Sequence, residues 1–79
     1  MTTLHRARNW KIQVFGREHG VPHFHVWTPN AAVVIAIDTL AVLSGSVDVG
    51  ALEEARSWAT DHRAELLAEW RRLNPEKPL

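Results

Sequence analysis

The sequence contains no cysteine and carries no net charge, because nine basic residues balance nine acidic ones among its 79 residues. The absence of cysteine excludes disulfides, cysteine-ligated zinc sites and a thiol nucleophile, and it fits a reducing compartment. Balanced charge argues against a nucleic-acid binder that relies on a large positive potential. We expect a cytoplasmic protein, because residues 1–10 hold no apolar run resembling a signal peptide and no stretch approaches the roughly 18 apolar residues of a membrane span.

The composition, 46% hydrophobic and 23% charged, is that of a globular domain, and we expect one domain over residues 1–79. A chain of this length buries only roughly 60% of the surface that its unfolded form exposes, so we expect a shallow functional site. We expect the four tryptophans to supply much of the stability that so small a core lacks. Residues 1–9 are expected to be loosely ordered, and residues 74–79 to form a C-terminal tail.

Strand-like patterns occupy the first half of the chain. Alternating or continuous apolar residues, bounded by glycine, proline, asparagine or aspartate, predict strands at residues 10–15, 23–27, 31–37 and 40–44. The short connections favour antiparallel pairing, because a parallel crossover needs a dozen or more residues. Within the second strand, Phe24 and Val26 face one way while His23, His25 and Trp27 face the other.

After Gly45 the apolar period changes to steps of three and four, which predicts one amphipathic helix with an apolar stripe of Leu52, Ala55, Ala59, His62, Leu66, Trp70 and Leu73. Asp48 is the expected N-cap, and Pro75 ends the helix. We therefore predict an α+β fold: a small antiparallel sheet of about four strands with one long C-terminal helix packed on one face. Trp70 either completes the edge of the core or projects toward a partner.

One cluster has the composition of a metal site. Glu18, His19, His23 and His25 place three imidazoles and a carboxylate within eight residues. The two strand histidines leave the same face, and the loop through Gly20 allows His19 to fold over them. This arrangement predicts a site for a divalent transition metal, with zinc or nickel preferred and Glu18 the weakest of the four ligands.

Two alternatives need no metal. The histidines can simply lie on a solvated or interface surface. As acids and bases near neutral pH, they can also serve a metal-independent ribonuclease, with Arg8, Lys11 and Arg17 facing phosphate. Nothing in the sequence selects between these hypotheses.

The outer sheet face is a candidate docking surface. Trp27, Phe15 and the helix-borne Trp70 are the expected partner-binding residues, with Val34 and Ala36 beside the two sheet aromatics. The occupant is a second copy of the chain or another protein, unless residues 1–10 fold back over this face.

A family resemblance rests on Glu18-His19, Pro22-His23-Phe24-His25 and Val26, followed by an apolar strand, Gly45, and a helix bearing Trp58 and Trp70. With these residues the chain resembles a bacterial family called domain of unknown function 4160 (DUF4160), over roughly residues 10–73. The resemblance implies an intracellular α+β protein. It also implies that the gene often lies beside one for a second small protein, which belongs to the family called domain of unknown function 2442 (DUF2442). Such pairs are similar to toxin–antitoxin modules. One departure is Asp38-Thr39, where such sequences commonly have a glycine at the turn. The leading hypothesis is a member of such a module with a metal or small-ligand site, and the alternative is a non-catalytic interaction module.

Overall fold

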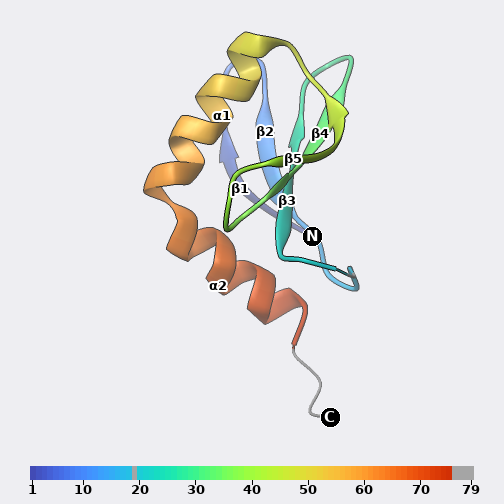
Figure 1. Ribbon diagram of the computed structural model, residues 1–79, viewed down its shortest axis with the longest axis vertical. Coiled ribbons are helices and arrows are strands. Elements are labelled where there is room, and N and C mark those ends of the chain that lie inside the picture. The colour runs from blue at the N-terminus through green and yellow to red at the C-terminus, as the bar shows by residue number, and fades with distance from the viewer. Residues whose placement is uncertain (19, 76–79) are drawn as a thin grey trace.

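A computed structural model of the chain describes residues 1–18 and 20–75, and shows an antiparallel sheet with two helices (Figure 1). The strands follow one another across the sheet in sequence order, each pairing antiparallel with the next. They are β1 (Thr2–Arg6), β2 (Lys11–Val14), β3 (His23–Trp27), β4 (Ala32–Ala36) and β5 (Val42–Ser46). The predicted α+β class is confirmed, but the sheet has five strands rather than about four.

The additional strand is β1, which pairs with β2 where we expected loosely ordered residues. Its sequence is mostly polar and has no clear alternation, so no pattern marked it as a strand. Tertiary contacts hold it instead. Gln13 donates a side-chain hydrogen bond of 2.9 Å to Thr3, and Thr2 donates one to Glu69 in the C-terminal helical region.

The predicted single helix is two helices, α1 (Val49–Asp61) and α2 (Arg63–Leu73), which meet at His62 (Figure 1). Nδ1 of His62 lies 2.7 Å from the carbonyl oxygen of Trp58, the acceptor that the His62 backbone N–H would use in a continuous helix. That N–H donates instead to Ala59, at 3.1 Å. A side chain has therefore replaced one step of the backbone ladder, which is a recognised cause of a kink.

The core lies between the helices and one face of the sheet. Ala51, Ala55 and Ala59 are the buried residues of α1, and their small side chains permit close approach to the strands. Asp48 caps α1 as predicted, accepting a hydrogen bond of 3.0 Å from the Ala51 N–H. The core consists of Trp10, Ile12, Val14, Phe24, Val26, Val33, Ile35, Ile37, Leu40, Ala51, Ala55, Ala59, Leu66 and Trp70. Neither of the two described helices has the length and apolar character needed to cross a membrane.

The β4–β5 connection is longer than a two-residue hairpin at Asp38-Thr39. Ala36 N–H donates to Ala41, and Leu40 adopts a left-handed backbone with φ of 61°. Guanidinium groups from both helices hold this loop: Arg56 donates to the Leu40 carbonyl and Arg63 to the Ile37 carbonyl, each at 3.0 Å. The loop therefore adopts its geometry without a glycine.

Gly45 gives a test of the β4–β5 pairing. Its φ is +77°, and a Cβ there would lie 2.4 Å from the Ala32 backbone oxygen. Gly20 also has a positive φ, +91°, but a Cβ there meets nothing within 4 Å. We expect Gly20→Ala to lower the free energy of unfolding by about 1–2 kcal/mol, which is the cost of placing a side chain on a left-handed backbone. Gly45→Ala should lower it by more, because β4 and β5 must also move apart to admit the Cβ. Urea unfolding of both variants measures the difference, and equal losses would contradict the pairing.

Glu69 joins α2 to β1 and makes stability depend on acid. Hydrogen bonds from Arg72 and then Thr2 lower its pKa from 4.5 to about 2. Because the folded pKa is depressed, the stabilisation is fully present above about pH 4.5 and is lost as the pH falls toward about 2. We expect Glu69→Gln to flatten the pH dependence of the unfolding free energy across that window. Glu53→Gln, an exposed change on α1, is the control and should leave the wild-type slope intact.

Candidate metal centre at the start of β3

The alternation of β3 places both histidines on the face opposite the core. Phe24 and Val26 are fully buried, while the side chains of His23 and His25 are 11% and 19% exposed. His25 lies opposite Gln13 of β2 on one side and Val34 of β4 on the other. His23, at the start of β3, lies opposite Ala36 of β4. The two imidazoles therefore start two residues apart on one strand, as the sequence predicted.

Glu18 reaches these rings because the chain turns sharply after β2. Gly16 passes so close to α2 that a Cβ there would lie 3.1 Å from the Leu73 carbonyl oxygen, and Arg17 has a left-handed backbone with φ of 59°. Asn74, which follows α2, holds both sides of this turn. Its Oδ1 accepts a hydrogen bond of 2.9 Å from the Glu18 N–H, and its Nδ2 donates one of 2.8 Å to the Phe15 carbonyl.

The carboxylate of Glu18 lies between the two imidazoles. Its Oε1 is 3.3 Å from Nε2 of His23 and 3.0 Å from Nε2 of His25. One ligand atom from each of the three residues lies within 4.8 Å of the others, a spacing at which one metal ion could contact all three. The Glu18 side chain is 32% exposed, so the centre is partly shielded but open to solvent.

The proton positions on His23 are constrained. Its Nδ1 lies 2.8 Å from the Val21 carbonyl oxygen, which only accepts hydrogen bonds. Its Nε2 faces Glu18 Oε1, which also accepts when the carboxylate is ionised. A neutral imidazole has one N–H, so it cannot donate to both oxygens. A neutral His23 ring therefore donates to only one of the two oxygens, and with its proton on Nδ1 the lone pair of Nε2 faces Glu18 Oε1, 3.3 Å away.

The electrostatics favour the ionised carboxylate. The hydrogen bond with His25 is the largest influence and lowers the pKa of Glu18 below its ordinary value; partial burial opposes this, and His23 lowers the pKa further. Glu18 is therefore an anion under the conditions in which a metal ion would bind to it.

Aromatic side chains fix the positions of the two rings. Trp70 packs against His23 and Phe15 against His25, with ring centroids 4.7 and 4.6 Å apart.

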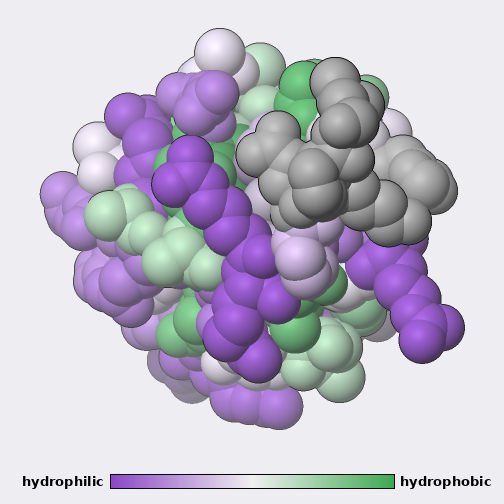
Figure 2. Space-filling model, turned by 90° about the horizontal axis from the view of Figure 1, so that it is seen from below, coloured by the Kyte–Doolittle hydropathy of each residue, from purple (hydrophilic) through white to green (hydrophobic). Residues whose placement is uncertain are grey.

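Beside Glu18 lies a cavity of about 860 Å³, whose lining includes Arg17, Trp70 and Arg71. Figure 2 views the molecule from this helical end, where the visible described residues form small hydrophobic areas between hydrophilic ones. The lining also contains the carboxylates of Glu18 and Asp38, so the cavity presents charges of both signs.

The structure places the predicted site residues in different surroundings. Glu18, His23 and His25 lie together, and His19 lies outside the described residues. Phe15 packs on His25 in the same cluster, and Trp27 remains 37% exposed. Trp70 is only 6% exposed and belongs to the core, one of the two alternatives that the sequence left open.

Sequence reasoning missed Asn74, which it assigned to a tail. The only signal was weak: an asparagine directly before Pro75, at the end of a helical pattern, is a common terminator. Its partners, Phe15 and Glu18, are nearly sixty residues away along the chain, so no local pattern indicated them.

Asn74 should control the mobility of the Glu18 turn. We expect Asn74→Ala to accelerate hydrogen exchange of the Glu18 amide by roughly 2- to 13-fold, the equivalent of one ordinary hydrogen bond. Asn74→Asp, which keeps the oxygen acceptor, should preserve more of the protection. Asn9→Ala in an exposed turn is the control, and unchanged Glu18 exchange in Asn74→Ala would contradict the assignment.

Comparison with known proteins gives one match. A family model described as domain of unknown function (DUF4160) matches residues 9–71 of the chain. No curated protein and no solved structure matches it.

Proposed function

The chain belongs to the DUF4160 family, and we propose that it binds a divalent transition metal ion through Glu18, His23 and His25. The observation that carries this proposal is the pair of acceptors around one imidazole. His23 points one nitrogen at the Val21 carbonyl and the other at the Glu18 carboxylate. A metal ion among Glu18 Oε1 and the two Nε2 atoms would satisfy all three lone pairs without a second proton on His23.

The spacing supports the same conclusion. Zinc binds imidazole nitrogen at about 2.0–2.1 Å and carboxylate oxygen at about 2.0–2.2 Å, so two ligands of a tetrahedral ion are roughly 3.3–3.5 Å apart. Glu18 Oε1 lies 3.3 and 3.0 Å from the two Nε2 atoms, close to that separation, and the ligand atoms of the three residues all lie within 4.8 Å of one another. Imidazole and carboxylate ligands suit zinc and nickel.

The surroundings resemble those of a supported metal site. The Val21 carbonyl lies 2.8 Å from Nδ1 of His23, and a proton donated to it from Nδ1 would leave the lone pair on Nε2 for a metal ion, as is usual for metal-ligating histidines. Three protein ligands would leave a further position for water or a ligand, and a zinc ion there would act as a Lewis acid on that molecule. His19 as an additional imidazole stays a prediction.

Metal titration of untagged protein tests the proposal. We expect about one zinc or nickel ion per chain, by calorimetry and by elemental analysis after dialysis. Glu18→Gln, His23→Ala and His25→Ala should each weaken binding at least about tenfold, because each removes one ligand or its charge. Affinity should fall with decreasing pH, since protons compete with the metal for both rings.

Matched controls distinguish this centre from adventitious binding. His5→Ala and Glu53→Gln remove the same types of side chain away from the centre and should leave the affinity unchanged. Nitrogen NMR should show the Nε2 resonances of His23 and His25 shifting on metal addition while Nδ1 of His23 keeps its proton. A wild-type stoichiometry near zero, or equal losses in the control variants, would refute the proposal.

An interaction module is the second candidate function, and β5 favours it. This edge strand is exposed throughout, including Val42 at 44% and Leu43 at 48%. Unpaired strand edges with apolar side chains are ready templates for pairing with another chain. A second copy of the chain, or a second small protein in a toxin–antitoxin-like pair, stays a prediction.

A further inference from the structure

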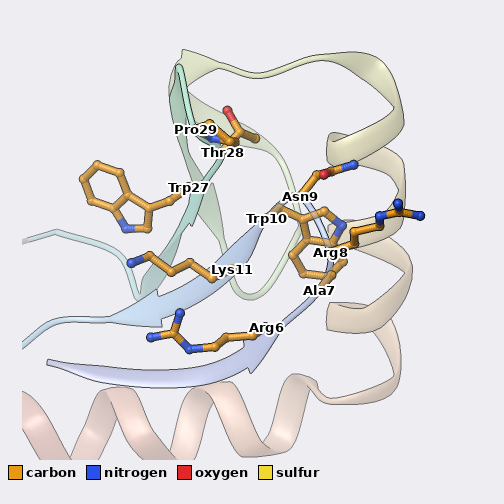
Figure 3. Close-up of a pocket in the computed structure, with 9 residues that line it drawn as sticks. All are labelled: Arg6, Ala7, Arg8, Asn9, Trp10, Lys11, Trp27, Thr28 and Pro29. Carbon is orange, nitrogen blue, oxygen red and sulfur yellow. The ribbon is translucent and has the colours of Figure 1, made fainter.

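A row of three residues crosses β1, β2 and β3 near one end of the sheet. Lys11 is in register with Arg6 on one side and with Trp27 on the other. We call Arg6, Lys11 and Trp27 the cation–tryptophan row. In Figure 3 their side chains lie side by side, while Arg8 and Trp10 lie in a separate group. The neighbours of the row in sequence, Ile12 and Val26, are fully buried, so the row occupies the face turned away from the core.

The two cations of the row have no carboxylate partner in the described ranges. The salt bridges there involve His23, His25, His62 and Arg72, and none involves Arg6 or Lys11. Arg8 lines the adjoining cavity together with Arg6 and Lys11, and no acidic residue is part of that lining. The chain as a whole is neutral, so the positive potential here is local.

Trp27 gives the row a flat aromatic surface. Its residue is 37% exposed, and its indole lies nearly parallel to the His25 ring, at 12° with centroids 6.1 Å apart. An open cavity of about 310 Å³ adjoins the row, and Thr28 and Pro29 contribute to its lining. That volume is at the lower end for small-ligand sites.

We propose that the cation–tryptophan row binds one nucleotide unit of a single-stranded nucleic acid or a free nucleotide, with the base stacked on Trp27 and phosphate paired with Lys11 and Arg6. Both sources present the same chemistry, a flat base joined to an anionic phosphate ester. Neighbouring strands lie about 4.8 Å apart, so the two cations and the indole form a continuous surface of the kind that binds single strands. A non-nucleic acidic ligand would use the cations but not the ring.

This proposal is independent of metal binding, and its test uses metal-free protein. Binding of fluorescent 12-nucleotide oligo(U) and oligo(dT) is measured by anisotropy at low salt, and binding of uridine monophosphate by quenching of tryptophan fluorescence. Preference for the oligomers indicates a strand, and equal affinity for the mononucleotide indicates a free nucleotide. Similar affinities of oligo(U) and oligo(dT) are expected, because stacking does not read the sugar.

Variants assign the binding to the row. Trp27→Ala should weaken binding roughly 5- to 150-fold, the range for removal of one base–aromatic stack, and Trp27→Phe should retain most of it. Lys11→Gln and Arg6→Gln should each weaken oligomer binding and reduce the slope of log K against log salt by about 0.7. Arg71→Gln, an exposed cation on α2, is the matched control and should change neither quantity.

Three results would overturn the proposal. The first is an absence of binding by any probe at millimolar nucleotide concentration and low salt. The second is an equal effect of Arg71→Gln and Lys11→Gln, which would indicate unspecific charge attraction. The third is unchanged affinity in Trp27→Ala together with equally tight binding of oligoglutamate, which would assign the row to acidic protein segments.

Discussion

The burial of Phe24 and Val26 is the constraint on which the candidate site depends. Both side chains are fully buried, and in a strand the residues between and beside them must point to the opposite face. That requirement gives His23, His25 and Trp27 a common face. A register slip of one residue would place the imidazoles in the core and the apolar side chains in solvent, so the energy of the core also maintains the site.

The second requirement is that two distant parts of the chain meet. Glu18 belongs to a loop, and a loop of this kind has no intrinsic reason to hold its carboxylate between two imidazoles. The C-terminal end of α2 supplies that reason through Asn74, which binds the backbone at both Phe15 and Glu18, and through Trp70, which packs on His23. The kink at His62 separates α2 from α1, so the direction of α2 is set independently of the α1 axis.

The outer face of the sheet joins the two proposed sites. His25 and Trp27 are two residues apart on β3 and their rings are nearly parallel, so the candidate metal centre and the cation–tryptophan row are neighbours. Their chemistry differs. The centre combines an anion with two imidazoles, whereas the row combines cations with an indole. The proposals therefore depend on different residues, and Glu18→Gln and Lys11→Gln separate them experimentally.

The sequence by itself determined the α+β class, the two-faced alternation of β3 with His23 and His25 on one side, and the Asp48 cap, because these follow from side chains close together in the chain. It proposed Glu18 as a neighbour of the two histidines, but the contact from Asn74 holds the Glu18 turn in place. It did not determine β1, whose polar residues form a strand only because β2 and α2 offer partners. It also missed the kink at His62, where one ring nitrogen replaces a backbone donor, and the role of Asn74. Tertiary contacts decided β1 and the role of Asn74, because their partners lie far away in the sequence, whereas the kink depends on a local hydrogen bond that the apolar periodicity does not encode.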